Sequence, residues 1–446
     1  MEELEHFAEL NLDDDKDWSK ENIVTHSEAG NRNRQVIIDD TDTNYEEVSM
    51  ARWPNCIEEK RIFDVRFHRL HDWKTFYNAM EQRTQRFVDR RVFEQRRAFG
   101  ASSGLPSTSS KRQKAADTES IPYDASVTSV AANQEFAAML VAPDQERPMD
   151  GHLWTFSTNN FEKSNWRKNT EWVVDFQVAH IHRDVLWVVA GNEIRVYKLP
   201  SCELVYRIDV WKTCKIVLAQ NVNTIRATQH TISVVTRSRG FIVFAVVNRT
   251  LQLLKWCNTN TATAEKYQYT TTAIFMDMLA FGRTDGIVEM WQIRIPADAD
   301  ATLEKVKENN WLEPVKTTSG ALVEPTQGVP INCIAMSGPK IAISTEKDMV
   351  MIDLSPNNRT QCKLTQIATV VDMQIFGDMI VVLSIDGGLS VGEFASGRTY
   401  CNTTQSIEDA RAGSAVGPWV FCTGDIAGAL FPNGNINVLN HTSAKR

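Results

Sequence analysis

The chain has 446 residues, of which 42% are hydrophobic and 23% are charged, and its 48 Lys and Arg against 56 Asp and Glu give a net charge of −8. This length exceeds one ordinary single-core domain and predicts two or three structural units. The acidic balance argues against a protein that coats nucleic acid along its whole surface. No apolar run approaches about 18 residues, so no membrane-spanning helix is expected.

Residues 1–50 are expected to form an acidic disordered tail. They hold 15 Asp and Glu against four Lys and Arg, and their few apolar residues show no period. The first residues lack an apolar core, so no secretory signal is expected, and the eight cysteines include no C-x-x-C pair. We therefore expect reduced thiols and a location in the nucleus or the cytoplasm.

Residues 51–99 have the opposite character, with twelve basic and seven acidic side chains. Apolar residues recur at steps of three and four from Phe63 to Met80, as on one face of a helix. Neither Gly nor Pro occurs between Cys56 and Phe99. The spacing predicts a helical segment made of two helices, over 57–81 and 83–99.

The apolar stripe of the first helix needs a cover, because several exposed aromatic and aliphatic side chains would make the free protein aggregate. Two covers stay open: the protein's own body, or a groove or helix of a partner. If a partner covers the stripe, we expect Trp73 and Phe76 to be its anchors, because aromatic residues dominate interface hot spots. The stripe residues predicted to bind the partner are Phe63, Phe67, Leu70, Trp73, Phe76, Tyr77 and Met80.

Residues 100–120 are rich in Ser and Gly and predict a flexible linker. From 121 to 441, short runs of Val, Ile, Leu, Met and Phe alternate with tight-turn residues, which predicts a mainly β domain. One unit recurs, formed by an apolar strand, a turn such as Asp285-Gly286 and an alternating strand. The turns lie 39 to 49 residues apart, except for one interval of 62 residues that holds a polar insertion at 296–328.

A period of about 40–50 residues with four strands to a unit is typical of a β-propeller. We predict seven blades, with six and eight as alternatives, and a short tail at 442–446. Pairing of 126–133 with the strand that ends near Asn440 is expected to close the ring. The Asp-Gly turns are predicted to be type I′, with φ > 0 at both central residues. Two nearly identical five-residue segments, 173–177 and 370–374, are expected to open two units.

The segment Thr284-Asp-Gly-Ile-Val-Glu-Met-Trp291 resembles the end of a blade in the WD-repeat family. The resemblance covers about 125–441 and implies a propeller that acts as a non-catalytic protein-interaction scaffold within a multiprotein complex. No Trp-Asp dipeptide ends a unit and no Gly-His doublet opens one, so the hydrogen-bond tetrad of the family should be largely missing.

Two further functions stay open. The plan of helical anchor, linker and propeller resembles substrate receptors of cullin-type ubiquitin ligases. The run Trp291-Gln292-Ile293-Arg294 resembles the W-D-x-R box that binds a propeller adaptor, with Gln at the Asp position. It marks Trp291 and Arg294 as further partner-binding candidates.

The second alternative is an RNA-associated subunit that uses the arginines of the predicted second helix, although Asp and Glu are interleaved with them. The sequence has no nucleophile elbow, phosphate-binding loop or dinucleotide fingerprint. No set of His and Cys stands at metal-ligand spacing either. We therefore expect no enzyme activity, no cofactor and no metal.

Overall fold

The computed structural model describes the ranges 44–53, 56–66, 70–88, 93–97, 126–133, 135–142, 146–147, 150–158, 166–238, 240–247, 250–257, 267–293, 312–314, 322–323, 329–346, 348–354, 360–365, 369–403, 419–422, 426–430 and 436–440. The acidic tail up to residue 43, the linker at 100–120, most of the insertion and the tail at 442–446 lie outside these ranges. None of the described helices is long and apolar enough to cross a membrane.

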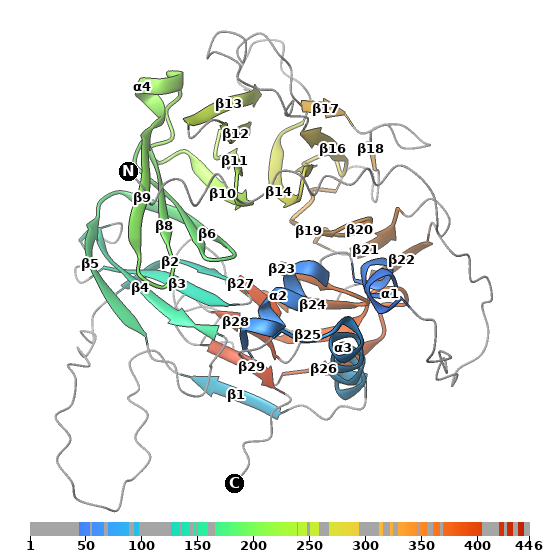
Figure 1. Ribbon diagram of the computed structural model, residues 1–446. Coiled ribbons are helices and arrows are strands. Elements are labelled where there is room, and N and C mark those ends of the chain that lie inside the picture. The colour runs from blue at the N-terminus through green and yellow to red at the C-terminus, as the bar shows by residue number, and fades with distance from the viewer. Residues whose placement is uncertain are drawn as a thin grey trace, which may run out of the picture.

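Within the described ranges the strands form seven antiparallel sheets, the blades of a ring (Figure 1). Blade 1 consists of β2 (Ser126–Ala132), β3 (Phe136–Ala142), β4 (Gly151–Ser157) and β5 (Arg167–Val173). Blade 2 consists of β6 (Phe176–His182), β7 (Val185–Ala190), β8 (Glu193–Lys198) and β9 (Glu203–Asp209). Blade 3 consists of β10 (Val222–Ala227), β11 (Thr231–Thr236), β12 (Phe241–Val247) and β13 (Thr250–Cys257).

Blade 4 consists of β14 (Tyr269–Phe275), β15 (Met278–Arg283), β16 (Val288–Ile293), β17 (Leu312–Pro314) and β18 (Leu322–Val323). Blade 5 consists of β19 (Cys333–Ser337), β20 (Lys340–Ser344), β21 (Asp348–Asp353) and β22 (Thr360–Thr365). Blade 6 consists of β23 (Val370–Phe376), β24 (Met379–Ser384), β25 (Leu389–Glu393) and β26 (Thr399–Asn402). Blade 7 holds β27 (Trp419–Cys422), β28 (Ile426–Leu430) and β29 (Ile436–Asn440).

The first strands of the blades line the centre of the ring. Each contacts the first strand of the next blade, and β27 of blade 7 contacts β2 of blade 1, so the ring is closed. The predicted seven-bladed propeller is confirmed. The predicted hairpins are the second and third strands of each blade. In β7 and β11 every residue is buried, because a central strand of a blade is covered on both faces by its neighbours.

The Asp-Gly turns connect these central strands, but they are not type I′. The φ angles of Gly286 and Gly387 are 85° and 82°, whereas Asp285 and Asp386 have no positive φ. Gly286 N also donates to Arg283 O at 3.4 Å. This is a type I turn followed by one left-handed Gly, a three-residue hairpin loop. The prediction of two positive φ angles is therefore wrong, although Gly is still required at the second position.

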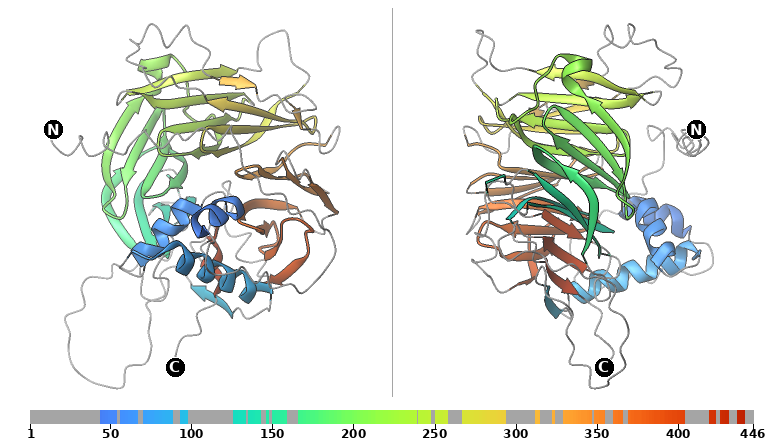
Figure 2. Two further views of the ribbon diagram at one scale, coloured as in Figure 1. Left: turned by 45° about the vertical axis from the view of Figure 1, so that its right-hand side comes forward. Right: turned by 90° about the vertical axis from the view of Figure 1, so that its left-hand side faces the viewer.

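The N-terminal segment contains three helices and a strand: α1 (Tyr45–Arg52), α2 (Cys56–Arg66), α3 (Trp73–Val88) and β1 (Phe93–Arg97). Helix therefore begins before the predicted end of the tail at residue 50. The predicted helix over 57–81 is interrupted because Asp72 starts a new helix, with its Oδ1 accepting from Thr75 N at 2.6 Å. The predicted helix over 83–99 is wrong beyond Val88, since β1 is a strand. All three helices lie on one face of the ring (Figure 2).

The strand that pairs with β29 and completes blade 7 is β1, and not the predicted segment at 126–133. β1 pairs antiparallel with β29, from Phe93 opposite Asn440 to Arg97 opposite Ile436, and becomes the outer strand of blade 7. The segment at 126–132 is instead β2, the innermost strand of blade 1, which pairs with β3. The chain thus supplies the last blade with a strand from its N-terminal segment, which ties the helices to the ring.

Candidate protein-interaction site

The apolar stripe of the helices is buried within the protein itself. Phe63, Phe76, Tyr77 and Met80 belong to one buried cluster with side chains of blades 6 and 7. Phe76 is 0% exposed, and its ring centroid lies 5.7 Å from that of Phe63. Of the two predicted covers, the one observed is therefore the protein's own body. The prediction that these four side chains bind a partner is corrected, because they are already covered.

The other stripe residues are placed differently. Leu70, which precedes α3, is 90% exposed. Trp73 is partly buried against the same cluster, and Lys60 Nζ lies 5.4 Å from the centre of its ring. Phe67 lies outside the described residues. Of the predicted stripe, Leu70 is thus the one described side chain fully open to a partner.

Trp53 is the anchor that sequence reasoning missed. It is buried at the end of α1 and lies against the turn between β23 and β24, where a Cβ on Gly377 would come within 2.1 Å of the indole. Arg52 Nε binds Asp378 Oδ2 in the same turn at 3.1 Å, and Lys340 Nζ of blade 5 binds Asp378 Oδ1 at 2.8 Å. Two features therefore hold the helices on this face of the ring. Gly377 leaves room for the indole of Trp53, and the carboxylate of Asp378 binds both Arg52 and Lys340.

Trp291 is not freely exposed. It lies on β16, packs against the cluster between blades 3 and 4, and has Lys255 Nζ 4.8 Å from its ring centroid. Its indole nitrogen is buried and has no hydrogen-bond partner among the described residues. Arg294 lies outside the described residues. The Trp of the segment that resembles an adaptor-binding box therefore packs mainly between blades 3 and 4.

Polar side chains on the first strands of blades 2, 3 and 4 each link their blade to the next. Gln177, Asn223 and Thr270 each occupy a register shift in the first strand of blades 2, 3 and 4. Gln177 Oε1 accepts from Val222 N at 3.3 Å, Asn223 Nδ2 donates to Thr270 O at 3.1 Å, and Thr270 Oγ1 donates to Ile331 O at 2.6 Å. These bonds join blades 2 to 5 in turn.

The two five-residue matches do not occupy equivalent positions. Val173 is the last residue of β5 and Asp175 lies in the turn before β6, whereas Val370 begins β23 and Asp372 lies within it. The expectation that both segments open a blade is therefore wrong for 173–177. Asp372, which is buried, has a separate role at the centre of the ring.

A buried ion pair crosses the centre of the ring. Arg226 Nη2 of blade 3 lies 3.3 Å from Asp372 Oδ1 of blade 6, and Val420 N of blade 7 donates to Asp372 Oδ2 at 2.8 Å. Burial raises the pKa of Asp372 above its ordinary value, and Arg226 offsets part of that rise. Burial, followed by the charge of Asp372, raises the pKa of the neighbouring Cys333 to about 12. The pair fastens three blades, and the thiol beside it stays protonated.

His180 lies beside this pair in β6. Burial, followed by the charge of Arg226, holds the pKa of His180 well below its ordinary value. Its neutral ring accepts a hydrogen bond from Ala227 N of blade 3 at 3.2 Å. His180 is therefore a link between blades 2 and 3.

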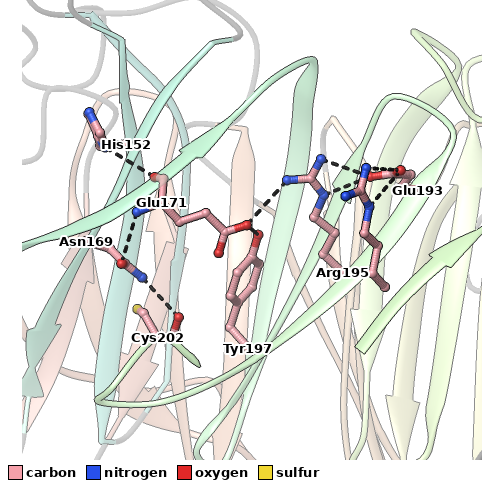
Figure 3. A network of polar contacts seen from close by, with 8 residues as sticks. His152, Asn169, Glu171, Glu193, Arg195, Tyr197 and Cys202 are labelled. Atoms are coloured by element: carbon pink, nitrogen blue, oxygen red, sulfur yellow. Dashed lines mark hydrogen bonds and ion pairs between the residues drawn. The ribbon is translucent and has the colours of Figure 1, made fainter. Parts of the chain in front are cut away.

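A second polar network joins β5, the outer strand of blade 1, to β8 of blade 2 (Figure 3). Glu171 Oε1 accepts from the Tyr197 hydroxyl at 3.1 Å and lies 3.6 Å from Arg195 Nη1. Glu193 accepts from Arg195 at 2.9 Å and from Arg207 at 2.6 Å. Burial raises the pKa of Tyr197 to about 12, so the phenol stays a hydrogen-bond donor. The network holds the two blades together.

The edge between blades 2 and 3 carries exposed aromatic and aliphatic side chains. Helix α4 (Val210–Cys214) follows β9 there, and Trp211 and Val217 are 47% and 49% exposed. Trp256, near the end of β13, is 50% exposed. These connections lie at the ends of the blades opposite the turns that carry Asp378 and Glu135, which the helices contact. We name Trp211, Lys212, Lys215, Val217 and Trp256 the α4 rim.

No protein-family model matches the chain. No curated protein matches it either. Solved structures with a similar fold include Kluyveromyces lactis Hsv2, with 11% identity, a TM-score of 0.47 and coverage of 69% of this chain and 91% of that one. The WD40 propeller domain of Doa1 covers 72% and 95% of the two chains at 10% identity and a TM-score of 0.47. A chain of the mitotic checkpoint complex covers 70% and 89% at 10% identity and a TM-score of 0.47.

The strand order of the chain itself decides its fold. Seven antiparallel sheets, first strands in a closed ring of contacts, and a last blade completed by an N-terminal strand define the architecture. The chain is a seven-bladed β-propeller.

Proposed function

We propose that the protein is a non-catalytic interaction scaffold, a subunit of a multiprotein complex that docks its partner at the α4 rim. The observation that supports this proposal is the unequal use of apolar side chains. The helices bury their aromatic stripe against the ring, whereas the α4 rim leaves two Trp side chains about half exposed on neighbouring blades. Trp is one of the residue types enriched in interface hot spots.

Charge at the α4 rim favours a protein partner with acidic and apolar side chains. Lys212 is exposed, and Lys215 Nζ lies 5.8 Å from the centre of the Trp211 ring. A cation beside an aromatic ring suits a segment that presents a carboxylate next to a hydrophobic side chain.

We expect the Trp211→Ala/Trp256→Ala variant to lose its co-purifying proteins while keeping the melting temperature of the parent. Hot-spot aromatic residues contribute at least about 2 kcal/mol each, so loss of both should weaken capture about a thousandfold. Quantitative mass spectrometry of the affinity-purified full chain measures the loss. It also identifies the partner class, since ligase subunits, RNA-binding subunits and other complexes are distinct.

Two controls locate the docking site. Trp172→Ala removes an equally exposed Trp from blade 1, away from the α4 rim, and should retain the partners. Leu70→Ala removes the most exposed apolar side chain of the helical segment. Partners lost from Leu70→Ala but retained by Trp211→Ala/Trp256→Ala would place docking on the helices and refute the proposal.

A further inference from the structure

The side chains of the α4 rim converge on one edge between blades 2 and 3. Trp256 stands opposite Ile242 in the β12–β13 ladder, and cross-strand partners share a face of the sheet. Ile242 belongs to the same buried cluster as Val210 and Ile216, which flank α4. The exposed Trp211, Val217 and Trp256 therefore border one apolar surface that continues outward from this cluster.

Basic side chains surround that surface. Lys212 is 82% exposed at its side chain, and Lys215 lies over the Trp211 ring without an ion pair to a described carboxylate. Arg237 is exposed, and its Nε donates to Val222 O at 3.3 Å, directly after the segment that carries Val217. Asp209 caps α4 and pairs with Lys212 at 3.3 Å. The rim thus combines aromatic surface with an excess of positive charge.

The chain contains a segment of complementary chemistry outside the described residues. Residues 1–43 hold 13 Asp and Glu against four Lys and Arg. Within them, 9–18 reads Glu-Leu-Asn-Leu-Asp-Asp-Asp-Lys-Asp-Trp, which sets an acidic run between Leu12 and Trp18. We infer that residues 9–18 of the same chain dock on the α4 rim, with the acidic run facing Lys212 and Lys215 and the apolar side chains facing the exposed tryptophans.

The length of the chain permits this contact. Trp18 is 26 residues before Asn44, the first described residue. That length spans at most about 90 Å, whereas a compact body of this size has a radius of gyration of about 20 Å. Tethering raises the effective concentration of a segment to about the millimolar range. A segment with only weak intrinsic affinity can therefore occupy the rim until a partner displaces it.

A zero-length carbodiimide cross-link tests the contact in the full chain, because it joins a carboxylate and an amine only where they touch. We expect cross-links from Asp13, Asp14 or Asp15 to Lys212 or Lys215. They should be lost in the Asp13→Asn/Asp14→Asn/Asp15→Asn variant, in Trp211→Ala/Trp256→Ala, and at about 0.5 M salt, where the Debye length falls to about 4 Å. Lys340 and Asp378, 2.8 Å apart, supply the internal positive control.

The outcomes separate this inference from the proposed function on which it rests. Absence of the cross-link while Lys340–Asp378 forms would overturn the inference, and loss of partners from the rim variant would still support docking there. Cross-links found only between isotope-labelled and unlabelled chains would also overturn it and name a second copy as the occupant. Cross-links within one chain, combined with partner capture that the Trp211→Ala/Trp256→Ala variant leaves unchanged, would support the inference and refute partner docking at the rim.

Discussion

Phe76→Ala is expected to lower the free energy of unfolding by about 3–5 kcal/mol, the range for deleting a buried aromatic side chain. Phe76 has no exposed surface, and the rings of Trp53, Phe63 and Trp73 lie within 6.3 Å of its own, centroid to centroid. The same cluster includes side chains of blades 6 and 7, so the cavity would open in the core that the helices share with these two blades. Chemical denaturation of the purified variant measures the loss.

Leu70→Ala is the matched control for this experiment. Leu70 belongs to the same predicted stripe but is 90% exposed, so its removal should change stability by no more than about 0.5 kcal/mol. If Phe76→Ala were as stable as Leu70→Ala, the helices would not be packed on the ring, and the aromatic stripe would again be available to a partner.

Arg226→Met is expected to destabilise the protein by about 3 kcal/mol, because it leaves the buried carboxylate of Asp372 without its cation. Met retains much of the apolar volume, so the loss reports the charge. Adding Asp372→Asn to Arg226→Met should restore part of the stability, since the second change removes the unpaired charge. Thermal and denaturant unfolding of both single variants and the double variant completes the cycle. Equal destabilisation by the single and double variants would contradict an ion pair.

The penalty of Arg226→Met should also depend on pH. The folded state raises the pKa of Asp372, and losing Arg226 raises it further, so the folded state binds a proton more tightly than the unfolded chain does. Above the raised pKa the variant carries an uncompensated buried charge. As pH falls through that value toward the lower folded-state pKa of Asp372 in the parent, the proton neutralises Asp372 in the variant first and the penalty shrinks. The difference from the parent should therefore shrink as the pH is lowered, and a difference that stays constant with pH would contradict this origin.

The central strands of each blade could be predicted from sequence because their signal is local. Runs such as Val185–Ala190 are buried on both faces, and in blades 2, 4 and 6 the run is followed by a turn glycine with a positive φ, Gly191, Gly286 or Gly387. The outer strand β1 has no such signal. Glu, Gln and Arg in Phe93–Arg97 favour helix, and the open edge of β29 decides their conformation.

The candidate site was harder to predict from sequence than the strands, because it depends on contacts between residues that are far apart in the chain. The stripe from Phe63 to Met80 was recognised as a surface that needs a cover, but its cover includes Phe376 and Met379, some 300 residues later in the chain. The start of α3 had a readable signal in Asp72 followed by Thr75. Trp211 and Trp256 could not be separated from buried tryptophans such as Trp187, because their exposure depends on where the neighbouring blade ends.

Cleavage of the chain between β1 and β2 tests most directly whether the N-terminal helices and β1 are part of the ring. A protease site inserted between residues 110 and 111 of the full chain, outside the described residues, allows the protein to be cut after it has folded. We expect the two fragments to co-elute as one particle in size-exclusion chromatography, because β1 pairs with β29 and the helices share a core with blades 6 and 7. Separation of the fragments, with the remaining ring still soluble and cooperatively folded, would contradict this account.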